Sequence, residues 1–266
     1  MSTHATLDDV RAVYSGAEGD LWELIMGQQI HIGGFRSSMD LADRAGIGAG
    51  TRGVDLCCCN GAGMRLLVRM RGVAGMTGVD ATPAVVARGE ARCAAEGLAG
   101  RIRFVTGDVC DSGLPGDSAD FVWGEDAWCY VGDKARLVRE AVRIVRPGGV
   151  IAFTDWVAGS VPLADAELQR LLDFMKFPNL ESIDGYRALL EARGCSVIEA
   201  TDTGRFADHV DLYLAMVDRQ LTYDALRLLD FDGDALAAVA AGMVFMRDLA
   251  RAGKLAQGRF IAHKRA

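Results

Sequence analysis

The sequence predicts an α/β fold with a mostly parallel, seven-stranded sheet, helices on both faces, and a helical cap inserted before the last strand. Two observations lead to this prediction. From Gly53 to Trp156, short apolar runs alternate with segments that carry a helical apolar stripe. Near the C-terminus, two further apolar runs are separated by a long helical segment. Alternating strands and helices are typical of a parallel sheet that is covered on both faces.

Length, charge and apolar content bound the class of protein. The chain has 266 residues, half of them hydrophobic, which is enough for one large domain with a full core. A net charge of −7 argues against a nucleic-acid partner, because such binding needs a basic face. No apolar stretch approaches the ~18 residues of a membrane span. We expect a small-molecule partner, no nucleic acid, no membrane, and a monomer or a homodimer.

The cysteines and the N-terminus predict a cytoplasmic location. Seven cysteines are present, and three of them are consecutive (Cys57, Cys58 and Cys59), which does not suit a disulfide framework. The first residues lack the basic and apolar regions of a signal peptide.

Residues 1–50 are predicted to form an N-terminal lid segment. Thr6 suits the N-cap of a helix over residues 6–15, since acidic residues follow it. Next comes an apolar stretch interrupted by glycines over residues 20–35, and a short helix is expected over 39–45.

Residues 51–202 are assigned to the core of the sheet. Within it, Thr82 and Pro83 resemble an N-cap and a first-turn proline. Strands are expected over residues 53–59, 75–80, 102–108, 119–126, 150–156 and 195–202, and helices over 63–71, 83–96, 133–145 and 186–193.

Residues 203–257 are assigned to the helical cap and residues 258–266 to the final core strand. Helical segments are expected near 205–230 and 234–252.

The turn after the first strand, DLCCCNGAG, is the first candidate for ligand binding. Open α/β sheets bind ligands beyond the carboxyl ends of their strands, and a turn that approaches a ligand closely needs small residues. Gly61 meets that need, whereas Cys57 and Cys59 are small but carry a Cβ atom. The alternative is a tight turn that binds nothing.

Two acidic residues at later strand ends are candidates for nucleoside binding. Asp80 ends the second strand at the spacing where a carboxylate binds ribose hydroxyls. The alternative is that it caps the next helix, for which Thr82 is better placed. Asp108, in the sequence GDV, suits an adenine amino group, and the alternative is a solvated turn residue.

In order and spacing, these segments resemble the class I S-adenosylmethionine-dependent methyltransferases, over about Gly53 to Trp156. VDLCCCNGAG takes the place of the acidic, glycine-rich first motif; GVD, GDV, ADFVWGED and RPGG take the later places. LWELIMGQQIHIGGF resembles the N-terminal segment of small-molecule methyltransferases, and LARAGKLAQGRFIAHK resembles the ending of sarcosine and dimethylglycine N-methyltransferases.

The resemblance implies a Rossmann-like fold, S-adenosylmethionine as cofactor and S-adenosylhomocysteine as product. The residues assigned to the cofactor are Tyr14, Trp22, Asp55, Cys57, Cys59, Gly61, Asp80, Ala81, Asp108, Val109 and Glu125. Gln29, Trp128 and Trp156 are assigned to the substrate, and His31 and Tyr130 to catalysis.

Each of these last roles has a structural alternative. His31 is the plausible general base, or it orders the N-terminal segment through a hydrogen bond. The aromatic rings of Trp128, Tyr130 and Trp156 suit a sulfonium or ammonium ion through cation–π attraction, or they fill the core under the cap.

The cysteine turn departs from the family pattern, which has glycines where Cys57 and Cys59 stand. The loss of two glycines predicts less strained backbone angles or a slightly displaced cofactor. Together with Cys129, these thiols also suggest a soft-metal or metalloid site. The usual metal-binding spacing is absent, so we favour a turn of small residues and expect no metal.

The predicted function is methyl transfer to a small molecule, with an amine as the nucleophile, since a neutral amine attacks a sulfonium without a base. Alternatives are O- or C-methylation of a secondary metabolite, a nicotinamide-dependent oxidoreductase, and a cofactor-binding module without catalysis. The sequence does not identify the substrate.

Overall fold

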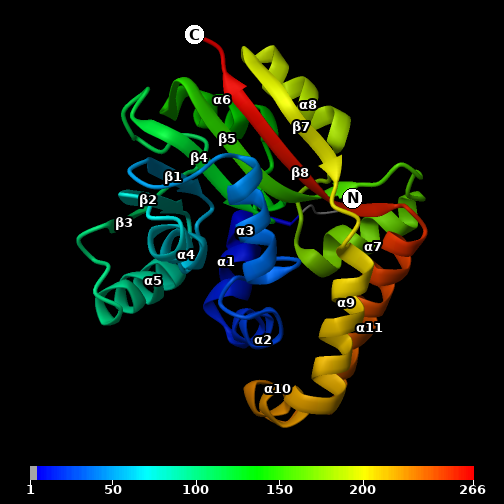
Figure 1. The fold of residues 1–266 in the computed structure, drawn as a ribbon. Helices are drawn as coiled ribbons and strands as arrows, with labels where there is room; N and C mark the ends of the chain where they lie inside the picture. The colour runs from blue at the N-terminus through cyan, green and yellow to red at the C-terminus, as the bar shows by residue number, and fades with distance from the viewer. Residues whose placement is uncertain (1–4) are drawn as a thin grey trace.

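The structure, a computed structural model, describes residues 5–266 and is built around one mixed sheet (Figure 1). The strand order is β3-β2-β1-β4-β5-β8-β7, with the two-residue β6 beside β5. Neighbours from β3 to β5 are parallel, and β8 is antiparallel to both β5 and β7. The predicted fold class is confirmed. The strands are β1 (Arg52–Leu56), β2 (Gly75–Asp80), β3 (Ile102–Thr106), β4 (Ala119–Glu125), β5 (Val145–Ala158), β6 (Glu181–Ser182), β7 (Cys195–Asp202) and β8 (Leu255–Lys264).

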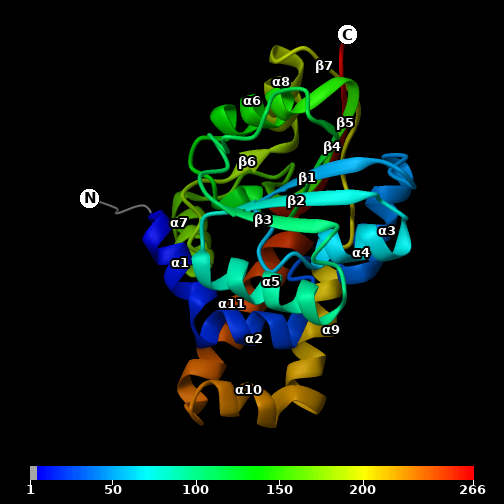
Figure 2. The ribbon, with the colours of Figure 1, turned by 90° about the vertical axis from the view of Figure 1, so that its left-hand side faces the viewer.

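Helices cover both faces of this sheet, which lies between them in Figure 2. Successive residues of β4 point to opposite faces: Val122 packs into the cluster with α6 and α8, and Trp123 into the cluster with α3 and α4. The bounds are α3 (Gly34–Arg44), α4 (Ala62–Met70), α5 (Pro83–Ala95), α6 (Lys134–Ile144) and α8 (Ile183–Ala192).

A third apolar cluster joins the N-terminal helices to the cap. Leu21, Trp22 and Ile25 on one side of the second helix pack with Met243 and Met246 of the last. The helices of this part are α1 (Leu7–Ser15), α2 (Ala17–Met26), α7 (Asp165–Met175), α9 (Phe206–Met216), α10 (Thr222–Leu228) and α11 (Gly233–Arg251). In Figure 1, α9 and α11 run side by side away from the sheet, with α10 at their tip.

Several boundaries differ from the expectation. Thr6 caps α1 as predicted, in a reciprocal capping box with Asp9. Helix α3 begins five residues before position 39, because Gly33 at φ 88° admits the left-handed turn that starts it. Strand β8 begins at Leu255, three residues before position 258.

No helix within residues 5–266 is long and apolar enough to cross a membrane.

Candidate functional site

Two adjoining cavities lie where the carboxyl ends of the strands meet the N-terminal helices. The larger, which we call the donor cavity, has an empty volume of about 920 Å³ including its mouth. Its walls come from the ends of β1, β2 and β4, from α1, and from the segment after α2. Sequence-predicted residues that line it are Tyr14, Gln29, His31, Asp55, Cys57, Cys59, Asp80, Ala81, Val109, Glu125 and Tyr130.

The cysteine turn keeps the backbone shape of a glycine turn. Cys57 has φ 66° and Cys59 has φ 46°, the left-handed region that L-residues avoid. The expectation of less strained angles is therefore wrong: the cysteines hold the strained conformation. Gly61 has φ 72°, and a Cβ atom there would approach the Phe104 ring to 2.5 Å. Gly61 does not itself line the cavity.

No further observation supports the hypothesis that these thiols bind a metal ion. Burial raises the pKa of the Cys57 thiol well above its usual value and, with Asp80, raises that of Cys59 to about 12. Metals bind the thiolate, which such shifts disfavour. The Cys129 Sγ lies 3.5 Å from the Asp126 carbonyl oxygen, and burial also raises the pKa of this thiol well above its usual value. No group of three or more His, Cys, Asp or Glu side chains within residues 5–266 is placed to hold a metal ion.

Asp80 ties the end of β2 to the turn after β1. Its Oδ2 accepts the Cys59 N–H at 2.9 Å, and its Oδ1 accepts the Thr82 N–H at 2.8 Å. Thr82 stands at the N-cap of α5 and Pro83 in its first turn, as predicted, although the Thr82 side chain makes no capping hydrogen bond. The Asp80 carboxylate also faces the cavity, where it is available to hydroxyl donors of a ligand.

The donor cavity is acidic. Asp55, Asp80, Glu125 and Asp126 line it, and no Lys or Arg is among the described residues that do. Burial raises the pKa of Asp55 well above its usual value, with further contributions from the charges of Glu125 and Asp80; burial also raises the pKa of Asp126. Unpaired buried carboxylates favour a ligand that carries positive charge.

His31 is buried and lies against the end of β4. Its Nε2 is 3.2 Å from Glu125 Oε1 and 3.1 Å from Ser38 Oγ. Glu125 Oε1 has no well-aligned hydrogen-bond donor among the described residues, so part of its acceptor capacity is free. The imidazole thus orders the N-terminal segment and also faces the cavity.

The smaller cavity, which we call the acceptor cavity, has an empty volume of about 460 Å³ including its mouth and lies under the cap. Tyr14, Ile30, Asp126 and Tyr130 line both cavities. The Tyr14 hydroxyl donates to the Tyr130 hydroxyl at 2.9 Å. This pair stands where the two cavities adjoin. Trp22 and Trp156 line only the acceptor cavity, so the structure brings Trp22 to the acceptor side rather than to the donor side.

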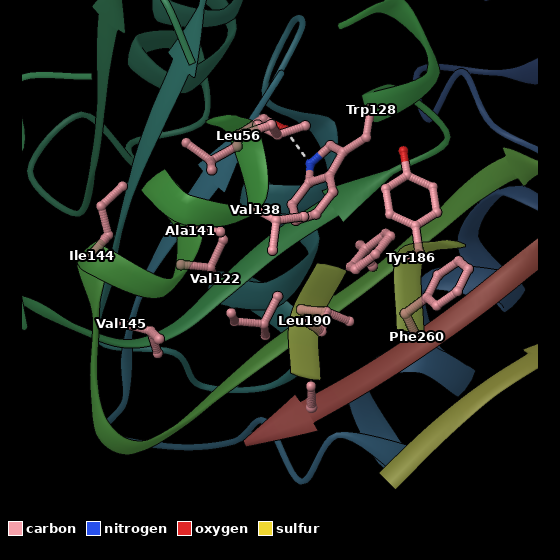
Figure 3. Close-up of a cluster of buried hydrophobic side chains, with 14 of the residues drawn as sticks. Leu56, Val122, Trp128, Val138, Ala141, Ile144, Val145, Tyr186, Leu190 and Phe260 are labelled. Atoms are coloured by element: carbon pink, nitrogen blue, oxygen red, sulfur yellow. Dashed lines mark hydrogen bonds between the residues drawn. The ribbon is translucent and has the colours of Figure 1, made fainter. Parts of the chain in front are cut away.

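The structure places Trp128 in the core instead of in either cavity. It is fully buried, stacks on Phe153, and donates its indole N–H to the Leu56 carbonyl oxygen at 3.3 Å. Figure 3 shows it beside Tyr186 within the cluster that α6 and α8 cover. Its predicted substrate contact is therefore corrected to a packing role, because its ring packs among core side chains and lines neither cavity.

Asp108 does not line the donor cavity. Its side chain is about half exposed, and it accepts the Cys110 N–H at 2.8 Å. Only its neighbour Val109 lines the cavity. Its predicted contact with adenine stays a prediction.

Three polar residues at or next to the cavities received no role from the sequence. Asp126 accepts the Ile32 N–H at 2.8 Å and the Gln257 side-chain amide at 2.8 Å. Tyr213 accepts the Gly33 N–H at 3.1 Å. Asp126 adjoins Glu125 at a strand end, which was a usable signal, whereas Gln257 and Tyr213 reach the site only through folding of the cap and the last strand.

Comparison with known proteins identifies the core of the fold. A family model described as a methyltransferase domain matches residues 54–153. The glycine/sarcosine/dimethylglycine N-methyltransferase of Actinopolyspora halophila is 26% identical over 253 residues, which are 90% of this chain and 44% of that protein. The chain spans less than two thirds of the length of the curated relatives that match it most strongly.

Solved structures share the whole architecture. A protein of Galdieria sulphuraria assigned as a sarcosine dimethylglycine methyltransferase has a TM-score of 0.83 at 23% identity, over 94% of this chain and 98% of that one. Phosphoethanolamine N-methyltransferase 2 of Haemonchus contortus, in complex with S-adenosylmethionine, has a TM-score of 0.86 at 20% identity, over 96% and 59%. Identities this low show the fold. Residues 54–153 thus match a methyltransferase domain, and the chain shares its fold with these methyltransferase structures.

Proposed function

We propose that this protein transfers a methyl group from S-adenosylmethionine to a small-molecule amine. The observation that carries the proposal is the meeting of an acidic donor cavity and an apolar acceptor cavity at Asp126 and the Tyr14–Tyr130 pair. Direct displacement needs donor and nucleophile held in contact with water excluded, and adjoining cavities under a lid suit that requirement.

The donor cavity fits the charge of S-adenosylmethionine. That molecule carries a sulfonium, an ammonium and a carboxylate, so its net charge is positive. We assign Asp80 to the ribose hydroxyls and Asp55 and Glu125 to the ammonium group, since all three line the donor cavity. NAD carries a diphosphate, which a cavity lined by four carboxylates and no described Lys or Arg disfavours. This weighs against the oxidoreductase alternative.

The lining of the acceptor cavity favours an amine as the methylated substrate. S-adenosylmethionine supplies an electrophilic methyl group: as the N–C bond forms, the C–S bond breaks and its electron pair stays on sulfur. We expect the positive charge that develops on nitrogen to lie near the Asp126 carboxylate and the rings of Tyr14, Tyr130 and Trp156, which line this cavity and would stabilise a cation. His31, Tyr130 and Gln29 are proposed to orient the acceptor.

One observation favours a second candidate, methylation of a hydroxyl group. His31 and Glu125 lie 3.2 Å apart at the cavity wall, an arrangement that suits a general base. A base contributes about 10²–10⁴-fold to hydroxyl methylation and little to attack by a neutral amine.

Ligand binding tests the cofactor. We expect S-adenosylhomocysteine to raise the melting temperature, with a stabilisation of about 2.7 kcal/mol at 100 times its dissociation constant. NAD should leave the melting temperature unchanged. A shift with NAD alone refutes the proposal.

Turnover tests the nucleophile. Tyramine carries an amine and a phenol in one skeleton, and mass spectrometry of the product locates the added methyl group. We expect it on nitrogen, and we expect His31→Gln to retain most of the rate. Methylation on oxygen, with a rate loss of about 10²-fold or more in His31→Gln, supports the hydroxyl candidate instead. Binding of S-adenosylhomocysteine without turnover of any amine or phenol supports the non-catalytic alternative.

A further inference from the structure

The acceptor cavity is lined mainly by apolar side chains, whereas the donor cavity is lined by four carboxylates. Four methionines contribute to it: Met26, Met175, Met243 and Met246. Two tryptophans, Trp22 and Trp156, complete much of the wall, and both are more than nine-tenths buried. Methionine side chains are unbranched and polarisable, so they fit against ring systems of irregular shape.

The cavity offers no positive group to an acidic substrate. No Lys, Arg or His is among the described residues that line it. Its charged group is Asp126, which makes no ion pair with a Lys or Arg in the described chain. Burying a second anion beside this carboxylate, without a cation or enough hydrogen-bond donors, is strongly unfavourable.

Hydrogen bonds hold Asp126 in place at the wall that the two cavities share. The Ile32 N–H donates to its Oδ2 at 2.8 Å, and the Gln257 amide donates to its Oδ1 and Oδ2 at 3.0 and 2.8 Å. Gln257 also donates to the Ile32 carbonyl oxygen at 3.0 Å. These contacts fix the carboxylate without neutralising it, and a carboxylate has acceptor capacity left after three such bonds.

We propose that the acceptor is a ring-bearing, largely apolar amine with no carboxylate or phosphate group, whose skeleton packs on the methionines and tryptophans and whose nitrogen faces Asp126. The inference rests on the proposed methyl transfer and narrows its substrate class. The nitrogen lone pair attacks the sulfonium methyl group, sulfur keeps the electron pair of the broken C–S bond, and a primary or secondary amine then releases one proton.

Matched pairs of probes test this inference. Phenethylamine and phenylalanine, tyramine and tyrosine, and tryptamine and tryptophan share their rings and amine, and the second of each pair adds a carboxylate. Binding is measured by calorimetry on the full chain saturated with S-adenosylhomocysteine. We expect at least one amine to bind, and its amino acid to bind at least about 30-fold more weakly, because the carboxylate is buried without a partner. Sarcosine and phosphoethanolamine should not bind detectably.

Two variants of one residue test whether the absence of a cation from the acceptor cavity causes the preference for amines. Met243 lines the cavity and is 2% exposed. Met243→Lys should reduce the preference for the amine over its amino acid at least tenfold, and Met243→Leu, which adds no charge, should keep it. S-adenosylhomocysteine binding shows that each variant is folded.

The outcomes are distinct. An amino acid that binds as tightly as its amine, or tight binding of sarcosine or phosphoethanolamine, overturns the inference. Failure of all three amines to bind a complex that does bind S-adenosylhomocysteine also overturns it, while the cofactor assignment stands. Failure to bind S-adenosylhomocysteine at all refutes the proposed function itself.

Discussion

At the scale of single residues, Cys57 and Cys59 hold backbone angles that L-residues avoid, in a turn that must approach a ligand. Both have positive φ, while Cys58 between them does not and is buried against Gly78. A left-handed residue with a Cβ atom costs roughly 1–2 kcal/mol relative to a relaxed conformation. The turn therefore stores strain that glycine would relieve.

Replacing these cysteines by glycine tests that strain. Cys57→Gly and Cys59→Gly should each change the free energy of unfolding by less than about 1 kcal/mol, because relief of strain offsets the greater entropy of the unfolded chain. Cys58→Gly is the matched control and should lose about 1–3 kcal/mol through lost packing. Urea unfolding measures all three. Equal losses at all three positions would contradict the strain argument.

Asp80 is expected to act on both the turn and the ligand. Asp80→Ala should weaken binding of S-adenosylhomocysteine by about 1.5–3 kcal/mol, since it removes a charged acceptor from two hydroxyl donors. Some stability should also be lost, because the Cys59 and Thr82 N–H groups lose their acceptor. Calorimetry and urea unfolding separate the two effects.

Asp108→Ala is the comparison for Asp80→Ala, because Asp108 does not line the donor cavity. Asp108→Ala should weaken the binding of S-adenosylhomocysteine less than Asp80→Ala does. If Asp80→Ala binds as the parent protein does, the ribose lies elsewhere.

At the scale of elements, α1 is a short helix that forms one wall of the donor cavity. Leu7, Val10 and Tyr14 of this helix line the cavity, and the capping box between Thr6 and Asp9 secures its start. Helices this short depend on caps and packing for their stability. The order of the lid therefore depends on an exposed cap outside the cavity.

Removal of the cap should loosen the lid without unfolding the core. Thr6→Ala should destabilise α1 by about 0.5–2 kcal/mol, seen as faster amide exchange in α1 while β1 and β4 are unchanged. Affinity for S-adenosylhomocysteine should fall a few-fold. Asp8→Ala, an exposed change in the same helix, is the control and should have little effect. Unchanged exchange in Thr6→Ala would show that packing alone holds the lid.

At the scale of the whole molecule, buried carboxylates make folding depend on pH. Burial raises the pKa of Asp55, Asp80, Asp126 and Asp155, the last to about 6. Asp155 accepts from the Tyr186 hydroxyl at 2.6 Å and the Cys129 N–H at 2.9 Å, beneath the site. Between pH 4 and 6 the folded state binds more protons than the unfolded state, so stability falls as pH rises.

The free energy of unfolding should therefore decrease from pH 5 to pH 7, and Asp155 contributes roughly 3 kcal/mol over its full titration. Carboxylates whose pKa is lowered by an ion pair, such as Glu140 at about 2, add stability that is lost only at lower pH. Urea unfolding at pH 5, 6 and 7 measures the slope. Asp155→Asn should flatten it, and an unchanged slope would contradict the assignment to Asp155.

The sequence by itself determined the order of most strands and helices and the positions of the strand-end acids. These depend on local patterns: apolar periodicity, turn residues and the spacing from Cys57 to Asp80. Each of these patterns lies within a short stretch of the sequence, at most from Cys57 to Asp80, so the tertiary fold changes little in what they predict. The N-cap at Thr6 and strand β7 were predicted for the same reason.

Only the tertiary structure decided which side chains meet. It turned Trp128 into the core, placed Trp22 on the acceptor side, and brought Gln257 from the last strand to Asp126. It also placed methionines from α2, α7 and α11 in one wall. Most of these contacts join residues that are far apart in the sequence, such as Gln257 and Asp126, which are 131 positions apart. The direction of a side chain there follows from packing between elements, which no local pattern records.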